Sequence, residues 1–330
     1  MVGSRRSASR LRFPKLGPAA LTRRLFERVP ELHSIARCTV DVFSNKDSSE
    51  FGFTDWQGLA DRIRKQGRGY RGVVVLHGTD TLAYTASALH YLLRGFSRPV
   101  VITGAQRPLE SLRNDARQNL ITAVEVAAQA PGASTSRAKV LVAFGDQVYL
   151  GVGVRKRSST EFRAFESPRT PVLAEIGSSI LYHPEFFSRH GSLAGGARVR
   201  LRGSTGEVLA LTGTPGFAGK LFTEDFFALR PAVVLTVYAS GTGPTRHPEF
   251  LEFLREIKRR KLPLVLVTER SGWSVDPKTY PAARALFEAD AIWATEMTPE
   301  CAYVKSVLVS HVLGRDRNAT RFRKTWNQLK

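Results

Sequence analysis

The chain has 330 residues, of which 42% are hydrophobic and 24% are charged. A chain of this length exceeds what one hydrophobic core usually serves, so the sequence predicts two domains and excludes a mainly disordered protein. Its apolar runs are too short to cross a bilayer, and Cys38 and Cys301 are too few for a disulfide framework or a cysteine-based zinc site. We therefore expect a cytoplasmic protein without membrane association.

The formal net charge of +20 is the one compositional feature that suggests a nucleic-acid partner. Much of the basic excess, however, lies in the first 24 residues and in the tail after Gly314. The sequence has no interleaving of basic and aromatic residues that would stack bases, and no recognisable nucleic-acid-binding module. We interpret the excess as solvated basic surface, and we do not expect a nucleic-acid partner.

Short apolar strands alternate with amphipathic helices along the first half of the chain. Residues 54–57 have the form of a capping box, and Trp56, Leu59 and Ile63 follow on one helical face. The pattern then predicts buried strands over 73–76, 99–103 and 140–144, and helices over 81–93 and 110–130. Near-continuous Val, Ile and Leu runs between helices indicate parallel strands that are covered on both faces.

Glycine, serine and arginine interrupt this alternation between residues 188 and 206. The alternation then resumes, with strands over 208–211, 232–238 and 263–267 and helices over 248–260 and after Thr298. The sequence therefore predicts an α/β protein. It has an N-terminal domain over residues 1–187, a linker over 188–206 and a C-terminal domain over 207–330.

The segment VVVLHGTDTLAYTAS, residues 73–87, places a Gly-Thr-Asp-Thr turn between a strand and a helix. Ligands bind at such junctions in parallel sheets, beyond the strand ends, where helix N-termini present free N–H groups. There Gly78 could bind a substrate carboxylate, Asp80 could pair with a substrate ammonium, and Thr79 could orient a water or share a proton. The alternative is that Thr79, Asp80 or Thr81 only caps the helix.

The same segment closely resembles the HGTDT motif of the bacterial L-asparaginase family. TGAQRP at 103–108 resembles the TGAxRP turn of that family, and residues 143–168 resemble the hairpin that supplies its catalytic lysine. YASGTG at 238–243 and EMTPECAYVK at 296–305 follow in the expected order, and the match is closest to the cytoplasmic, type I branch. The resemblance implies an asparaginase-like fold of two α/β domains with mainly parallel sheets covered by helices.

The resemblance also implies a function: hydrolysis of L-asparagine, and by extension L-glutamine, without a metal or organic cofactor. It implies a homodimer or homotetramer. Thr79 matches the threonine of the family's second catalytic motif, Asp80 its neighbour that binds the substrate α-amino group, and Lys156 the lysine of a Thr-Lys-Asp relay. A buried lysine can accept a proton from a hydroxyl. Without the resemblance, Lys156 between Arg155 and Arg157 would fit a solvated basic turn equally well.

Other substrate contacts are implied by the same comparison. Ser48 or Ser49 would contact the substrate α-carboxylate, and Gly104 and Ala105 would approach the side-chain amide through backbone groups. From the residues alone, the serines fit an ordinary polar turn beside Asp47, and the Gly-Ala pair fits a tight turn after a strand. His77 and Glu296 are expected to be structural.

This chain departs from the family at its start. The family has its principal nucleophile, a threonine, in a TGGTI motif just after the first strand, and a tyrosine on the mobile loop that follows. Neither the TGGTI threonine nor the tyrosine has a counterpart at the start of this chain, where the first threonine is Thr22 and the first tyrosine is Tyr70. We therefore expect that the coding sequence begins too late, near the methionine that often follows TGGTI, and that the chain as written is nearly inactive. Three functions stay open: an amidohydrolase, a catalytically silent amino-acid-binding protein, and an RNA-associated amidotransferase subunit.

Overall fold

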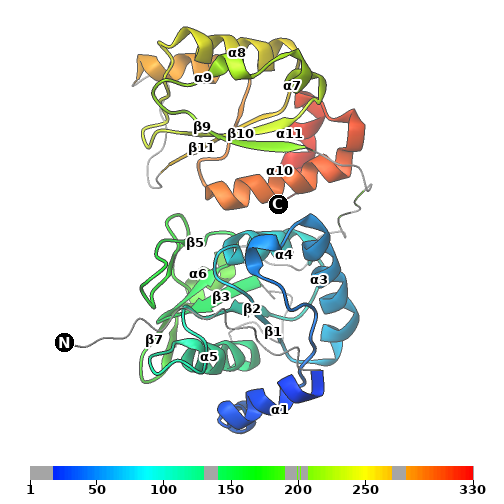
Figure 1. Ribbon diagram of the computed structural model, residues 1–330, viewed down its shortest axis with the longest axis vertical. Coiled ribbons are helices and arrows are strands. Elements are labelled where there is room, and N and C mark those ends of the chain that lie inside the picture. The colour runs from blue at the N-terminus through cyan, green and yellow to red at the C-terminus, as the bar shows by residue number, and fades with distance from the viewer. Residues whose placement is uncertain are drawn as a thin grey trace, which may run out of the picture.

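The computed structural model describes residues 18–129, 140–189, 199, 201, 207–269 and 280–329. Within them the chain forms two α/β halves, each built around its own main sheet. Figure 1 shows the N-terminal half in blue to green and the C-terminal half in yellow to red, stacked along the long axis. The predicted linker lies mostly outside the described residues, so the domain boundaries stay predictions.

The N-terminal sheet has six strands in the order β1 (Val73–Leu76), β2 (Val100–Thr103), β3 (Val140–Phe144), β4 (Gln147–Leu150), β7 (Ala174–Ile176) and β8 (Ile180–Tyr182). β1, β2 and β3 are parallel, whereas β3, β4, β7 and β8 pair in antiparallel fashion. A separate antiparallel pair joins β5 (Arg155–Lys156) to β6 (Phe165–Glu166). The parallel strands β1, β2 and β3 are therefore connected by helices, and the antiparallel strands β4, β7 and β8 extend the sheet beyond β3.

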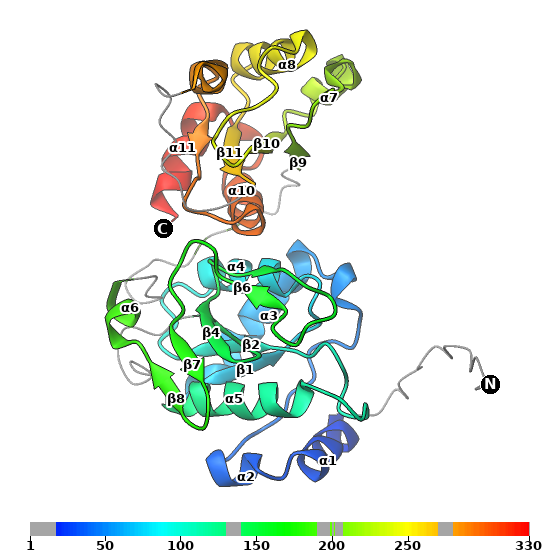
Figure 2. The same ribbon diagram turned by 90° about the vertical axis from the view of Figure 1, so that its left-hand side faces the viewer.

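Helices cover both faces of the parallel strands, as predicted. Val100 and Ile102 of β2 pack in the same cluster as α3 (Phe53–Gln66) and α4 (Leu82–Leu92), whereas Val101 packs with α5 (Ala116–Gln129). Figure 2 shows α5 on one side of the strands and α4 on the other. The remaining helices of this half are α1 (Pro18–Arg28), α2 (Leu32–Ile35) and α6 (Pro184–Arg189). Alternation along each strand thus sends successive side chains into two different clusters.

The C-terminal sheet has four parallel strands in the order β12 (Ile292–Trp293), β11 (Leu264–Thr268), β10 (Ala232–Val237) and β9 (Val208–Thr212). Its helices are α7 (Glu224–Ala228), α8 (Pro248–Arg259), α9 (Arg284–Glu288), α10 (Pro299–Leu313) and α11 (Ala319–Gln328). Short 3₁₀ turns lie at Ser48–Glu50, Gly67–Gly69, Gly219–Leu221, Pro281–Ala283 and Gly314–Asp316. α8 packs on one face of β10, and α10 packs on the other.

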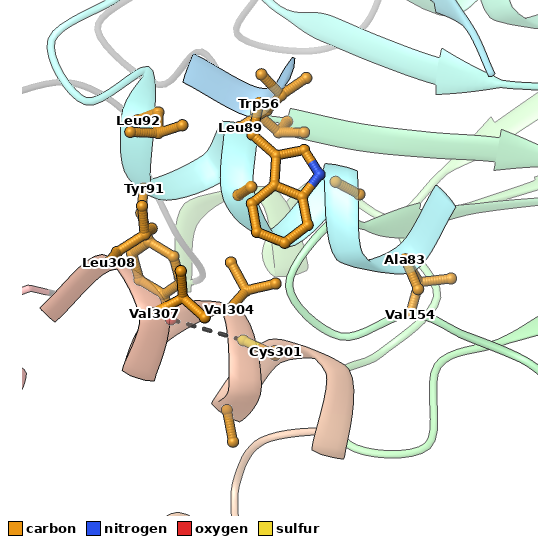
Figure 3. Close-up of a cluster of buried hydrophobic side chains, with 14 of the residues drawn as sticks. Trp56, Ala83, Leu89, Tyr91, Leu92, Val154, Cys301, Val304, Val307 and Leu308 are labelled. Atoms are coloured by element: carbon orange, nitrogen blue, oxygen red, sulfur yellow. Dashed lines mark hydrogen bonds between the residues drawn. The ribbon is translucent and has the colours of Figure 1, made fainter. Parts of the chain in front are cut away.

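Helix α10 joins the two halves. Val304 and Leu308 are fully buried in a cluster that also contains Leu89 of α4 and Val234 of β10, so the helix has apolar neighbours on both sides. Figure 3 shows this contact, with the Tyr91 hydroxyl of α4 directed at the Cys301 sulfur of α10, 3.6 Å away. The core is therefore continuous from the first sheet through α4 and α10 to the second sheet.

Three local predictions need correction. The capping box is displaced, because α3 begins at Phe53 with Gly52 as its N-cap, and the Asp55 carboxylate accepts the Gly52 N–H at 2.9 Å. α5 begins at Ala116 instead of residue 110, because the preceding residues form a turn. Strand β1 has the predicted bounds, but it is not fully buried: it lies at an edge of the sheet, and Leu76 is 54% exposed.

Candidate active site

Thr79, Asp80 and Lys156 come together at the carboxyl end of β1. Lys156 Nζ donates to Thr79 Oγ1 at 2.8 Å and to Asp80 Oδ1 at 2.7 Å. Thr79 and Asp80 lie in the turn between β1 and α4, and Lys156 lies on β5. The Lys156 side chain is 18% exposed and that of Asp80 is 67% exposed, so the cluster is closed around the amine and open at the carboxylate. A hydroxyl, an amine and an accessible carboxylate are thus in direct contact.

Helix capping does not explain the polar residues of this turn. Thr81 is the N-cap of α4, but its side chain makes no capping hydrogen bond and donates instead to the Ser48 carbonyl at 2.6 Å. The side chains of Thr79 and Asp80 are engaged with Lys156. The capping interpretation is therefore wrong, and the partial positive charge of the α4 N-terminus stays available beside the cluster.

The basic run around Lys156 divides its side chains among three directions. Arg157 is exposed and pairs with Glu161 at 2.9 Å, as expected of a solvated basic turn. Arg155 reaches the C-terminal half, where its Nε lies 3.7 Å from Glu300 and its Nη1 donates to the Glu269 carbonyl at 3.4 Å. Lys156 alone turns inward, so the solvated-turn interpretation holds for Arg157 and is wrong for Lys156.

The two candidate serines occupy different environments. Ser48 is buried, and a Cβ on Gly78 would lie 2.6 Å from its hydroxyl oxygen, so the two residues are in close contact. Ser49 is exposed, and its N–H and hydroxyl both donate to Asp47 Oδ1, at 2.8 and 2.7 Å. These bonds lower the pKa of Asp47. Ser49 therefore fits the polar-turn interpretation, whereas Ser48 lies against the turn that carries Gly78 and Thr79.

Gly104 and Ala105 follow β2 next to the same turn. A Cβ on Gly104 would overlap the carbonyl oxygen of His77, which explains why glycine is required there. Ala105 helps to line a groove of about 290 Å³ at the ends of β1 and β2, together with Leu76 and His77. The predicted backbone contacts of Gly104 and Ala105 thus lie beside the Thr79 turn.

Sequence reasoning missed the buried Asp115, which shapes the turn after β2. Its carboxylate accepts the backbone N–H of Gln106 at 3.0 and 2.9 Å and that of Arg107 at 2.9 Å. Asn119 donates to Asp115 at 3.1 Å and to the Gly104 carbonyl at 2.9 Å. In the sequence, Asp115 looks like one of the acidic residues that are common in the first turn of a helix. Nothing in the sequence distinguishes it as a residue that binds the turn before that helix.

His77 is held as a neutral imidazole beneath the site. Its Nδ1 lies 2.7 Å from the Gly78 carbonyl, which can only accept, so Nδ1 carries the proton. Its Nε2 accepts from the Thr85 hydroxyl at 3.0 Å, and that hydroxyl in turn accepts from the Trp56 indole at 3.1 Å. Burial lowers the pKa of His77. His77 is therefore a structural support, as expected. Glu296 is exposed, and its expected structural role stays a prediction.

Comparison with known proteins agrees with the fold and the ordered motifs. The family model described as Asparaginase, N-terminal, matches residues 3–186. L-asparaginase 1 of Escherichia coli K12 is 32% identical over 282 residues, which cover 86% of this chain and 80% of the relative. The crystal structure of L-asparaginase I from Vibrio cholerae superposes with a TM-score of 0.74 at 28% identity, covering 93% of this chain and 89% of the other.

A probable cytoplasmic L-asparaginase from Campylobacter jejuni has the same fold, with a TM-score of 0.76 at 24% identity and 95% coverage of both chains. The fold and these matches place the chain among the amidohydrolases. It belongs to the asparaginase family and is similar to the type I branch. The predicted asparaginase-like α/β fold is thereby confirmed.

Proposed function

We propose that this chain is the main part of an L-asparagine amidohydrolase that uses Thr79, Asp80 and Lys156. The proposal depends most on one observation, the contact of Lys156 Nζ with both the Thr79 hydroxyl and the Asp80 carboxylate. Membership of the asparaginase family supports the substrate class. L-glutamine is a second proposed substrate.

The site geometry suggests how a small amino acid would bind. The exposed Asp80 carboxylate would pair with the substrate ammonium, which would then compete with Lys156 for that carboxylate. The α-carboxylate would lie by Ser48 and Gly78, near the α4 N-terminus, where N–H groups and the helix dipole favour an anion. The turn at Gly104 and Ala105 would hold the side-chain amide through backbone groups.

The chemistry that we propose is acyl transfer. A hydroxyl attacks the carboxamide carbon, the C–N bond breaks, and ammonia leaves with a proton; water then hydrolyses the acyl ester to release aspartate. In the first step the proton of the attacking hydroxyl would pass through Thr79 to Lys156, as a neutral amine, and from there to the leaving nitrogen. In the second step a proton of the attacking water would pass by the same route to the nucleophile's oxygen as the ester C–O bond breaks. Asp80 would fix the positions of both the amine and the substrate.

The first nucleophile of the family has no counterpart among the described residues, and the edge of β1 supports an added strand that would carry it. β1 is entirely apolar, yet its first three residues are only partly buried and Leu76 is exposed, whereas the residues of β2 and β3 are fully buried. Within the described residues no strand pairs with the other edge of β1. We propose that a further strand of the polypeptide lies there and brings the nucleophile to the end of the 290 Å³ groove.

Ammonia release from asparagine by the chain as given, and by a form extended through its upstream in-frame codons, tests both parts of the proposal. We expect the extended form to be active and the shorter form to be slower by several orders of magnitude. Equal rates would contradict the added nucleophile, and so would an immediate upstream stop codon. Asparagine binding by the extended form without turnover, in titration calorimetry, would instead identify a silent amino-acid-binding protein.

We also propose a homo-oligomer, a dimer or tetramer, located in the cytoplasm, as the type I relationship suggests. Across the described part of the chain, no helix has the length and apolar character needed to span a bilayer. Size-exclusion chromatography with light scattering tests the assembly, and a mass equal to one chain would contradict it.

A further inference from the structure

Gln106 joins the three segments that build the candidate site. Its Oε1 accepts from the Thr79 hydroxyl at 3.2 Å. Its Nε2 donates to the carbonyl oxygens of Ser158 and Glu161, at 3.1 and 3.4 Å. One amide therefore connects the turn after β1, the turn after β2 and the loop that follows Lys156.

These partners determine how the amide is oriented. The two backbone carbonyls only accept hydrogen bonds, so the NH₂ group of Gln106 must face them and its oxygen must face Thr79. The Thr79 hydroxyl has a single proton, which this arrangement directs to Gln106. Its lone pairs are thereby turned toward Lys156 Nζ, which donates at 2.8 Å.

The backbone of Gln106 is as firmly held as its side chain. Its N–H donates to both oxygens of the buried Asp115 carboxylate. Hydrogen bonds from backbone N–H groups to this buried carboxylate fix the turn, so the Gln106 side chain extends from a rigid backbone. A group held in this way can set the geometry of a neighbouring hydroxyl to within a few tenths of an ångström.

We propose that Gln106 is a positioning residue of the asparaginase reaction, a role that rests on the proposed function. While Lys156 donates to Thr79, Gln106 holds the Thr79 proton and keeps the oxygen lone pairs on Lys156 Nζ; once the amine is neutral, that proton turns from Gln106 to Nζ. Gln106 also ties down residues 158–161, so that β5 keeps Lys156 in contact. Gln106 contacts the Thr79 hydroxyl and the loop that follows Lys156, so it acts on the reaction through both of them.

Two substitutions separate the orienting role from a merely structural one. Gln106→Met keeps the length of the side chain and removes all three hydrogen bonds. Gln106→Glu keeps the shape and the acceptor toward Thr79, but it replaces both donors with a carboxylate oxygen that faces two carbonyls. The new charge lies within roughly 6 Å of Lys156 Nζ, a distance at which an opposite charge favours the ionised amine.

The first measurement needs no turnover and uses the chain as given. Only the unprotonated amine reacts with acetic anhydride, so acetylation of Lys156, quantified by mass spectrometry across a pH series, reports its protonation. Gln106→Glu is expected to move this curve to higher pH by about one unit or more, and Gln118→Glu on the exposed face of α5 is expected to leave it unchanged. An unmoved curve for a folded Gln106→Glu would overturn the proposed contact.

The second measurement follows the loop. Hydrogen exchange of the amides at 157–161 is expected to accelerate about tenfold or more in both Gln106 variants, because the two ties to the loop are lost. In whichever form hydrolyses asparagine, both variants are expected to lower kcat by about tenfold or more and to change KM less. Unchanged exchange together with unchanged kcat in Gln106→Met refutes the role. If no form hydrolyses asparagine, the proposed function fails, while the acetylation and exchange data still decide the position of Gln106.

Discussion

Lys156 Nζ lies 2.8 Å from the hydroxyl oxygen of Thr79, although the two residues are 77 positions apart in the chain. The contact exists because the antiparallel pair β5–β6 folds back over the carboxyl end of β1. Of the three basic residues at 155–157, only Lys156 is directed at the turn. The pairing of the two-residue strand β5 with β6 therefore determines that the Lys156 amine faces the Thr79 hydroxyl.

Replacing Lys156 by Met is expected to lower kcat for asparagine by at least about a hundredfold in the active form, because the group that exchanges a proton with Thr79 is lost. Met retains most of the aliphatic length, so the fold is expected to persist. The matched control is Arg157→Met, whose side chain is exposed and pairs with Glu161 on the surface. Steady-state ammonia release measures both; a Lys156→Met enzyme with the control's kcat contradicts the relay.

Asp80→Asn tests the proposed ammonium contact. Hydrogen bonds to charged groups contribute about 1.5–3 kcal/mol, so the affinity for asparagine or aspartate is expected to fall by about 10- to 100-fold. Titration calorimetry on the extended form gives the affinity directly. Asp316→Asn serves as the control, because Asp316 is an exposed acid that pairs with Arg321 in the C-terminal half. Equal affinities for the Asp80 variant and the parent would remove Asp80 from substrate binding.

Much of the architecture follows from hydrophobic periodicity alone. The strand over 140–144 and the helix that starts at Pro248 have the predicted positions, because apolar runs bounded by turn residues indicate elements with little ambiguity. The start of α5 could not be predicted in this way. Asp115 binds the N–H groups of the preceding turn, and that tertiary contact decides where the helix begins.

The candidate site was predictable only in part. Thr79, Asp80 and Lys156 follow from the family motifs, and the structure brings them together. Periodicity could not show that β1 is an edge strand, since an apolar run reads as buried whether or not a neighbour is present. Gln106 escaped notice because its role depends on three segments distant in the sequence, and no local pattern records such a contact.

His77 is expected to make stability depend on pH. Its pKa is lower in the folded chain than its ordinary value near 6.5, because burial disfavours the charged ring. As pH falls, the unfolded chain binds this proton first, so the contribution of His77 is fully present above about pH 6.5 and is lost as pH falls toward the folded-state pKa. The loss is at most about 1.4 kcal/mol per pH unit.

Urea unfolding between pH 7.5 and 5 measures this contribution in the parent and in His77→Gln. The variant is less stable at pH 7.5, because it loses the hydrogen bonds to Gly78 and Thr85 in their present geometry. Its stability is also expected to decline less steeply below pH 6.5 than that of the parent. Parallel pH profiles would show that the pKa of His77 is the same in the folded and unfolded chains, against the effect of burial argued here.

Gly78 is expected to tolerate no side chain, since an added Cβ would lie 2.6 and 2.7 Å from the Oγ and Cβ of Ser48. Ser48 is buried, so it cannot swing away at little cost, and overpacking of this kind typically costs about 1–3 kcal/mol. Gly78→Ala should lower the free energy of unfolding by that amount and displace the turn that carries Thr79. Gly69→Ala is the matched control, because nothing lies within 4 Å of its added Cβ.

The clash with Ser48 makes a second prediction that distinguishes crowding from a change in backbone freedom. Ser48→Gly removes both atoms that an added Cβ on Gly78 would meet. The double variant is therefore expected to be more stable than the sum of the two single effects predicts, with a coupling of about 1 kcal/mol or more for residues in contact. Thermal and urea unfolding of the four proteins gives this coupling. A strictly additive pair would mean that Gly78 is required for its conformation and that its contact with Ser48 is incidental.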